Sequence, residues 1–303
     1  RRDYPNLLRI AYVEVPANPA ASTLMSMKTG GFLKKRTQLG AVDSLSERSD
    51  YSEAAFSSVL LGMSQPADGQ GGCEDRVQYK VRLPGNPILG EGKPENQNHA
   101  IIFARGEHLQ TLDMNQDNYM GEAFKMRNML ECFKGDVRLV GCREHIFSEA
   151  GGAVAEFAAS NEFVFGTSLQ RFLTFPLCVR FHYGHPDVWD KQWALCNGGV
   201  SKASRTLHLS EDIFGGMNVV MRGGAVSYQE FIHVGKGRDM TFTATDSFTS
   251  KISGGNALQS IARDMHRLNE HFDLARVLSL WATGPGAFAS TTFLVRATVR
   301  VRV

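Results

Sequence analysis

Segments with strand and helix character alternate along the chain from residue 77 to residue 240. Val77–Leu83 (VQYKVRL) alternates polar and apolar residues, which is typical of a half-buried strand. His99–Ala104 (HAIIFA) and Leu109–Leu112 predict a buried strand and its turn, and Tyr119–Phe133 has apolar residues at helical spacing. Further strand and helix candidates follow at residues 137–142, 157–175, 191–195 and 213–221. Because such alternation builds a sheet covered by helices, it predicts an α/β fold.

The chain before residue 77 has a different pattern. Ile10–Val15 and Phe56–Leu61 are short β-rich runs, whereas residues 16–50 and 62–75 show little periodicity and predict long loops. We therefore expect three parts. Residues 1–76 form an N-terminal strand with a poorly ordered insertion, residues 77–276 form the main domain, and residues 277–303 form a tail.

An uncharged stretch, Val277–Val295, opens that tail. It is long enough to span a membrane, but Gly284, Pro285 and Gly286 dilute its hydropathy. Two interpretations stay open at this point: the start of a membrane region, and a buried helix followed by a loop.

Charge and cysteine content exclude several classes of protein. The chain has 33 basic and 31 acidic residues, a net charge of +2, so binding of nucleic acid through bulk charge is disfavoured. Its five cysteines include no CxxC pair, which argues against a disulfide framework or a zinc ribbon. The N-terminus has no apolar run, so we expect no signal peptide, and we expect the chain to be a fragment of a longer protein.

Two glycine-rich segments carry basic residues, a combination that is typical of sites that bind phosphate or sugar. The first, residues 83–99, contains Lys93, but Pro94 stands where a P-loop needs Ser or Thr, so nucleoside triphosphate hydrolysis is not indicated. The second, Gly235–Met240, contains Lys236 and Arg238 and matches a dinucleotide fingerprint only in part.

Two acidic segments are candidates for chemistry. Asp113 and Asp117 follow an apolar run, where carboxylates hold a hard cation such as Mg²⁺ or Mn²⁺, or a ribose; the alternative is an Asx-rich turn. Glu211 and Asp212 follow Ser210 at the start of an apolar helical pattern. A helix N-terminus favours the ionised carboxylate that a general base requires, although plain helix capping explains the same pattern.

One histidine-containing segment supports a rival function. His182, His185 and Asp187 lie within six residues, a set that ligates zinc or iron in metal-dependent hydrolases. The alternative is a hydrogen-bonded structural loop, because Pro186 interrupts any single helical face.

Taken together, these strings have the order found in a known family. The segments GNPILGEGKPENQNHAIIF, DMNQDNY, REHIF, RFHYGHPD, GGVSKAS, LSEDIFGGMN and GKGRDM resemble those of the 1,3-β-glucan synthases, which include callose synthases and fungal glucan synthases. The resemblance covers about residues 77–282. It implies a GT-A-like α/β domain with a mixed central sheet flanked by helices. It also implies an inverting enzyme that transfers glucose from UDP-glucose to a growing 1,3-β-glucan chain.

The resemblance assigns roles to the candidate residues. Glu211 and Asp212 are similar in setting to the TED triplet of cellulose and chitin synthases, which makes Asp212 the expected base, with Glu211 next. Asp113 resembles the first acid of a DxD motif, although Asn115 replaces the second acid and Asp117 follows later. This departure leaves a requirement for Mg²⁺ or Mn²⁺ open.

Donor-binding and cellular roles follow from the same resemblance. Lys93 and Lys251 resemble lysines that compensate the charge of the diphosphate, and Lys236 and Arg238 fall near the acceptor-side QxxRW motif without matching it. The family implies a multi-pass plasma-membrane protein whose catalytic domain faces the cytosol, and a Rho-type GTPase as a regulatory partner. From the balanced charge we expect no nucleic-acid partner.

Overall fold

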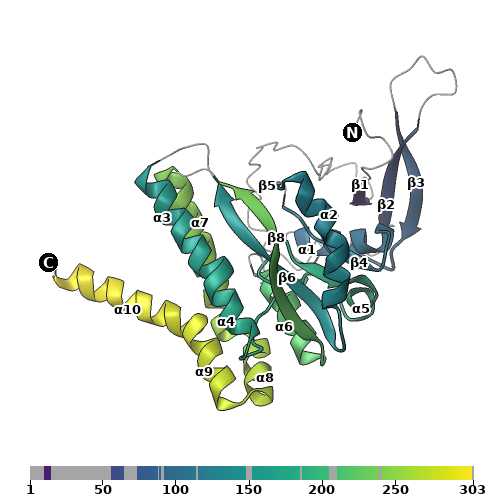
Figure 1. The fold of residues 1–303 in the computed structure, drawn as a ribbon. Coiled ribbons are helices and arrows are strands. Elements are labelled where there is room, and N and C mark those ends of the chain that lie inside the picture. The colour runs from purple at the N-terminus through teal and green to yellow at the C-terminus, as the bar shows by residue number, and fades with distance from the viewer. Residues whose placement is uncertain are drawn as a thin grey trace, which may run out of the picture. The chain divides into compact units, whose positions relative to one another are not determined.

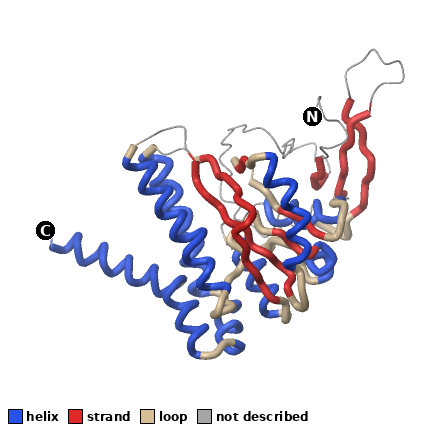
Figure 2. The backbone as a smooth tube through the Cα atoms, in the orientation of Figure 1, coloured by secondary structure: helices blue, strands red, loops and turns tan. Residues whose placement is uncertain are grey.

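The computed structural model describes residues 10–14, 56–64, 74–87, 89, 92–113, 115–147, 152–184, 186–204, 210–238 and 241–301. The chain divides into two compact units, residues 1–105 and residues 106–303. Figure 1 labels the elements of both units, and Figure 2 shows which segments are helix, strand and loop.

The first unit contains a three-stranded antiparallel sheet. Its strands are β1 (Ile10–Glu14), β2 (Ser57–Ser64) and β3 (Glu74–Arg82), paired in the order β1-β2-β3. All three strands were expected, but β2 and β3 extend into residues 62–64 and 74–75, where a loop was expected. The pairing of β2 with β3 begins at Glu74, so β3 runs through the domain boundary expected after residue 76.

The segment HAIIFA is helical, so the expectation of a buried strand there is wrong. Helix α1 (Lys93–Ala100) continues into a 3₁₀ turn, η2 (Ile101–Phe103). Three features start this helix: Gly92 in the left-handed region with φ of 90°, Pro94 in the first turn, and the acidic Glu95. Proline and acidic residues favour a helix N-terminus, and these local signals override the apolar run that follows.

The second unit is built on a five-stranded mixed sheet with the order β4-β7-β6-β8-β5. Its strands are β4 (His108–Gln110), β5 (Gln116–Asp117), β6 (Val137–Phe147), β7 (Val188–Asp190) and β8 (Ala225–Gly237). The two long strands β6 and β8 are parallel, and the other neighbouring pairs are antiparallel. The expected α/β class with a mixed sheet is therefore confirmed.

Helices surround this sheet (Figure 1). They are α2 (Met120–Met129) with η3 (Leu130–Cys132), α3 (Ala153–Phe163), the π-helical η4 (Val164–Leu169), α4 (Gln170–Thr174), α5 (Lys191–Cys196), α6 (Glu211–Met221), α7 (Phe242–Ile261), α8 (Arg263–His271), α9 (Leu274–Thr283) and α10 (Pro285–Val301). The domain boundary expected after residue 276 falls inside α9. In the described ranges, no helix combines the length and the apolar character needed to span a membrane.

Two apolar clusters stabilise the second unit. One joins Met129 of α2 to buried side chains of the sheet, Val140, Cys142, Val188, Ile232 and Val234. The other joins α6 to the loop before β7 and to α8 and α9, through Phe181, Phe214, Met217, Met265, Leu268 and Leu280. The first cluster fixes α2 against the sheet, and the second fixes α6, which begins with Glu211 and Asp212, against α8, α9 and the loop before β7.

The ladder between β6 and β8 contains a wide irregularity. Cys142 pairs with Gln229, but the next residue, Arg143, pairs with His233, so three residues of β8 have no partner on β6. The side-chain oxygen Oε1 of the buried Gln229 accepts hydrogen bonds from the backbone N–H groups of Phe231 (2.7 Å) and Ile232 (3.0 Å). This side chain satisfies backbone donors that the ladder leaves unpaired.

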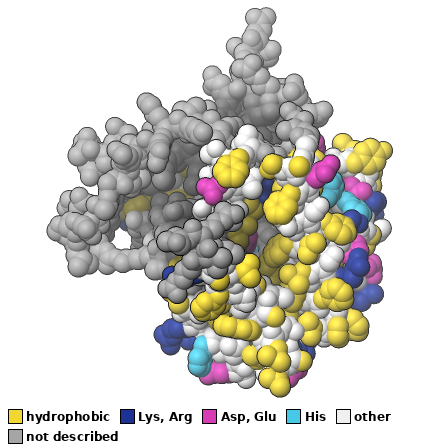
Figure 3. All heavy atoms as spheres, turned by 90° about the vertical axis from the view of Figure 1, so that its left-hand side faces the viewer, with side chains coloured by type: hydrophobic (Ala, Val, Ile, Leu, Met, Phe, Trp, Pro, Cys, Tyr) yellow, Lys and Arg dark blue, Asp and Glu magenta, His cyan; other side chains and the backbone are white. Residues whose placement is uncertain are grey.

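The face of the second unit that includes α3, α7 and α10 is rich in apolar side chains (Figure 3). Exposed members include Phe157, Phe242, Ile261, Phe293 and Leu294. Large apolar patches on a protein surface commonly mark contact with another molecule or with lipid.

Candidate active site

The main polar cluster of the second unit surrounds the ammonium group of Lys236. The Lys236 Nζ lies 3.1 Å from Oδ2 of Asp113 and 3.2 Å from Oε1 of Glu144. Gln116 completes the group: its Oε1 accepts a hydrogen bond of 2.9 Å from the backbone N–H of Asp113, and its side chain hydrogen-bonds to Glu144. We call these four residues the Lys236 cluster.

Strand pairing explains why these residues meet although up to 123 positions separate them. Lys236 of β8 lies opposite Gln116 of β5 on one side and opposite Ile146 of β6 on the other. Residues directly opposite in a ladder share a face, and Glu144 lies two positions before Ile146, so it has the same facing. The order β6-β8-β5 therefore places Glu144, Lys236 and Gln116 on one face of the sheet, with Glu144 diagonal to Lys236.

Burial changes the acidity of this cluster. Burial, and to a lesser degree the nearby Glu162, raise the pKa of Glu144 to about 7 against the opposing effect of Lys236. Burial alone would lower the pKa of Lys236, but the attraction of Glu144 and Asp113 is stronger, so the net shift is upward. The lysine is therefore a permanent cation between two carboxyl groups.

Arg238 continues the cationic row at the end of β8. Its Nη2 lies 3.4 Å from Oε2 of Glu162 on α3, and its guanidinium stands 3.7 Å from the ring centroid of Phe248 on α7. Asn115 fixes the adjacent backbone, because its Nδ2 donates a hydrogen bond of 2.8 Å to the carbonyl oxygen of Gly237. Near the carboxyl end of β8, Lys236 is thus held by two carboxyl groups, and Arg238 is held by a carboxylate and an aromatic ring.

Glu211 and Asp212 begin helix α6, as the sequence predicts. Glu211 is buried, and Asp212 is half-buried, with its Oδ1 accepting a hydrogen bond of 2.9 Å from the backbone N–H of Ile213. Ser210 occupies the cap position, but its hydroxyl makes no capping hydrogen bond and instead accepts one of 3.4 Å from Gln259. The acidic pair therefore lies in the positive field of the helix N-terminus.

The loop before β7 lies directly against this helix start. A Cβ added to Gly184, whose φ is 97°, would lie 3.0 Å from Oδ2 of Asp212, and one added to Gly216 would lie 2.0 Å from the backbone nitrogen of His182. At Gly216 only glycine fits, because another backbone approaches this closely, and Gly184 has a positive φ that other residues rarely adopt. The two glycines allow α6 and the loop to pack at a distance that places Asp212 beside Gly184.

A buried ion-pair network fixes that loop. The two terminal nitrogens of Arg180 each lie 3.1 Å from an oxygen of Asp187, and Nδ1 of His182 lies 2.9 Å from Asp187 Oδ2. The side chains of all three are at least 97% buried, with exposures of 3%, 2% and 1%. Burial would raise the pKa of Asp187, but Arg180 and His182 outweigh it and hold the pKa below its usual range.

This network argues against the interpretation of the segment as the metal site of a hydrolase. Both oxygens of Asp187 are taken by Arg180 and His182, so the carboxylate is not presented to a metal ion. His185 lies outside the described residues. Within the described part of the chain, no group of three or more His, Cys, Asp or Glu side chains is arranged to hold a metal ion.

The residues proposed for a DxD-type cation do not fit one. Asp113 is paired with the ammonium of Lys236, which supplies positive charge where a divalent cation would have to bind. Asn115 turns its amide to Gly237, and the side chain of Asp117 is exposed on the short strand β5. We therefore derive no chemistry through a cation at these residues.

Two further predicted site residues lie on helices α1 and α7. Lys251 is exposed on α7, three residues after Phe248. Lys93 is the exposed first residue of α1 and belongs to the first unit. The sequence analysis missed Glu144 and Glu162; the signal for Glu144 was a carboxylate in the largely apolar strand VRLVGCREHIF, whereas a glutamate within a helix gives no such signal.

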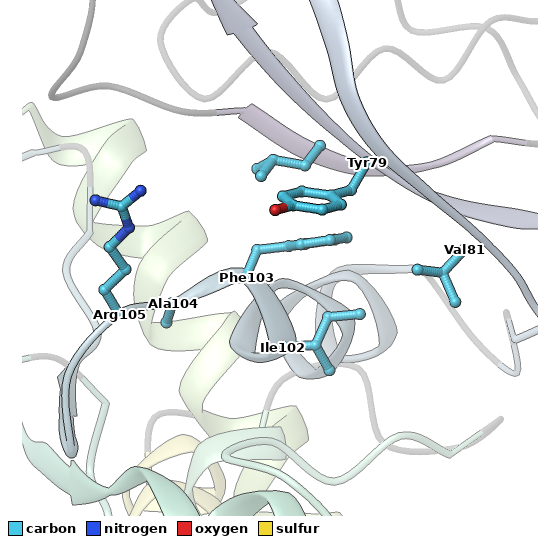
Figure 4. Close-up of a pocket in the computed structure, with 7 residues that line it drawn as sticks. Tyr79, Val81, Ile102, Phe103, Ala104 and Arg105 are labelled. Carbon is cyan, nitrogen blue, oxygen red and sulfur yellow. The ribbon is translucent and has the colours of Figure 1, made fainter.

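The first unit has a pocket that the sequence did not predict (Figure 4). It encloses about 450 Å³ and is lined by Leu60, Tyr79, Val81, Ile102, Phe103, Ala104 and Arg105. The rings of Tyr79 and Phe103 lie over one another, and the guanidinium of Arg105 stands at one side (Figure 4). The lining is thus aromatic and aliphatic, with one cationic group.

Comparison with known proteins identifies close relatives. The profile of the "1,3-beta-glucan synthase component" family matches residues 27–302. Callose synthase 3 of Arabidopsis thaliana is 50% identical over 251 residues, which cover 80% of this chain and 13% of that protein. Callose synthase 4 of the same plant is 51% identical over 244 residues, or 78% of this chain and 13% of that protein. The chain thus spans about an eighth of the length of these relatives.

Solved structures show only a distant likeness. Mannosyl-3-phosphoglycerate synthase from Rubrobacter xylanophilus has a TM-score of 0.36 at 16% identity, covering 61% of this chain and 54% of that one. Glucosyl-3-phosphoglycerate synthase from Mycobacterium tuberculosis has a TM-score of 0.33 at 14% identity, covering 59% of this chain and 58% of that one. Scores in this range are too low to transfer a function.

Proposed function

Because this chain belongs to the 1,3-β-glucan synthase family, we propose that it is the catalytic segment of a glucosyltransferase. It transfers glucose from UDP-glucose to the end of a growing 1,3-β-glucan chain, with inversion at the anomeric carbon, in a GT-A-like domain. The family match over residues 27–302 supports this proposal. The single structural observation that carries the mechanism is the position of Asp212, held at the start of α6 against Gly184.

In the proposed reaction, the 3-hydroxyl oxygen of the acceptor attacks C1 of the donor glucose. The bond from C1 to the β-phosphate oxygen breaks, UDP leaves with the bonding electron pair, and the hydroxyl proton passes to the carboxylate of Asp212. A general base of this kind contributes about 10²–10⁴-fold to a rate. The field of the helix N-terminus keeps Asp212 ionised before the reaction, and Glu211 is the second candidate for the base.

The departing UDP needs positive charge. Lys236 and Arg238, fixed at the end of β8, supply two cations, and we assign Lys93 and Lys251 the same role toward the diphosphate. Fixed cations stabilise a leaving group that gains negative charge in the transition state. In this proposal Asp113 orients Lys236, and Asp117 contributes to the donor site from the adjacent strand.

The setting in the whole protein follows from the family. We propose that the full-length protein is a multi-pass protein of the plasma membrane with this segment in the cytosol, and that a Rho-type GTPase regulates it. The relatives are about eight times as long as the region matched here. Membrane-spanning segments therefore have room in the parts of the full-length protein that lie outside this chain.

The test uses a version of the protein with the full length of its relatives. Asp212→Asn keeps the size of the side chain and removes its basicity, so incorporation of radiolabelled glucose into 1,3-glucanase-sensitive polymer should fall at least ~10²-fold. Binding of UDP-glucose, measured by titration, should persist. Asp136→Asn, which changes an exposed carboxylate before β6, serves as the matched control.

Normal polymer synthesis by Asp212→Asn would exclude this residue as the base. Glu211→Gln would then be expected to show the selective loss. If the unsubstituted protein formed no polymer from UDP-glucose, the proposed function itself would be wrong.

A further inference from the structure

Glu144 is a buried carboxylate on the central strand of the sheet, and the reaction proposed above gives it no role. Its side chain is 11% exposed, and its Oε1 is buried without a hydrogen bond of good geometry although Lys236 lies 3.2 Å away. A buried carboxyl group destabilises a fold unless its contacts compensate, so its presence calls for a physical reason.

The contacts of Glu144 close a ring. The backbone N–H of Asp113 donates to Gln116, Gln116 hydrogen-bonds to Glu144, Glu144 pairs with Lys236, and Lys236 pairs with Asp113. Three strands contribute to the ring, because Gln116 belongs to β5, Glu144 to β6 and Lys236 to β8. A lysine side chain has several rotatable bonds, and a closed ring restricts it to one orientation.

The ring leaves donor capacity on Lys236. An ammonium group has three N–H donors, and in the described residues two carboxyl groups lie within ion-pair distance of it, Asp113 at 3.1 Å and Glu144 at 3.2 Å. Arg238, two residues further along β8, is held in a similar way by Glu162 and Phe248. The two cations are therefore oriented before any anion binds, which reduces the entropy lost on binding.

We infer that Glu144 is a positioning residue that acts through Lys236, holding its ammonium in place for the diphosphate of the donor. This inference rests on the proposed function and adds to it a residue that the donor does not need to touch. Asp113 alone cannot replace Glu144, because a lysine paired on one side only is free to rotate away from β6.

The test compares Glu144→Gln with the unsubstituted full-length protein at pH 8, where Glu144 is mostly ionised. Glutamine keeps the shape and the hydrogen-bonding capacity and removes the charge. We expect KM for UDP-glucose and the inhibition constant of UDP to rise about 10-fold, the scale of one lost charged contact, with kcat changed much less. Glu131→Gln, which alters an exposed glutamate paired with Lys134, is the control and should change neither constant.

Two further measurements separate positioning from a merely structural role. In a Lys236→Gln background, Glu144→Gln should have no additional effect on KM, because its action passes through the lysine. In the unsubstituted protein, KM should rise between pH 8 and pH 6 as Glu144 becomes protonated, and Glu144→Gln should lack this rise. The charged groups that act on Glu144 are Lys236 and Glu162, and these two are paired in turn with Asp113 and Arg238.

The inference is wrong if KM of Glu144→Gln stays within twofold of the unsubstituted value, or if the substitution is equally harmful without Lys236. Either result can be obtained only when the unsubstituted protein makes polymer. Failure of this inference is therefore distinct from failure of the proposed function.

Discussion

Asp187→Ala should strongly destabilise the second unit, because it removes the centre of a buried ion-pair network. Asp187 accepts from both terminal nitrogens of Arg180 at 3.1 Å and pairs with His182 at 2.9 Å. It also receives the backbone N–H of Cys142, on β6, at 3.4 Å. Alanine would remove from the guanidinium of Arg180, with only 3% of its side chain exposed, the carboxylate that neutralises it.

The magnitude follows from that burial. Removing one partner of a buried ion pair lowers the free energy of unfolding by about 3–5 kcal/mol, since the remaining charge stays desolvated. An exposed pair provides the matched control: Arg171 makes a bidentate contact with Glu230 at 2.6 and 2.7 Å, but its side chain is 61% exposed. Glu230→Ala should therefore lower the free energy of unfolding far less than Asp187→Ala does.

Urea titration of the purified protein, followed by tryptophan fluorescence, measures both variants. Trp189 is fully buried on β7, two residues after Asp187, so its emission reports on this region. The dependence of the free energy of unfolding on acidic pH gives a second readout. Because the folded pKa of Asp187 is lowered, its stabilising effect is present above the pKa of the unfolded chain and is lost as the pH falls through the folded value. A loss below about 1 kcal/mol for Asp187→Ala would refute the argument that this network holds the loop.

Two other substitutions test the packing and the acidity described above. Gly216→Ala should lower the free energy of unfolding by about 1–3 kcal/mol or more, measured by the same titration, because its Cβ would lie 2.0 Å from the backbone nitrogen of His182; an unchanged urea midpoint would contradict this contact. Glu144 has a folded pKa of about 7, above its ordinary value, so its contribution to stability is present below the unfolded pKa and is lost as the pH rises through 7. Glu144→Gln should therefore abolish a loss of about 3 kcal/mol between pH 4.5 and pH 7, and parallel pH profiles for the two proteins would contradict it.

Local sequence patterns predicted the elements that carry the site, but one local pattern misled. The acidic pair before an apolar helical pattern correctly located the start of α6 at Glu211. HAIIFA was misassigned because its apolar run resembles a strand, whereas Gly92, Pro94 and Glu95 begin a helix just before it. Start signals for a helix act over the first turn, so they had more weight than the composition of the residues that follow.

The contacts within the candidate site depend on topology, which local patterns do not contain. Asp113 and Lys236 were both candidates, but their pairing requires β5 to lie beside β8, and Glu144 joins them only because β6 is the other neighbour. The role of His182 and Asp187 likewise depends on Arg180, which their spacing alone does not indicate. Sequence patterns identified the residue types for the chemistry, whereas the order of the strands determines their partners.

The irregularity in β8 has a consequence for comparing family members. The three residues between Gln229 and His233 lie outside the ladder, and pairing resumes where Arg143 meets His233. Such a bulge can change in length without turning the residues that follow, because the facing of Lys236 is set by its pairing with Ile146 and Gln116. A gap in a sequence alignment at residues 230–232 is therefore compatible with the Lys236 cluster, whereas a one-residue gap between His233 and Lys236 would turn the lysine to the opposite side of the sheet.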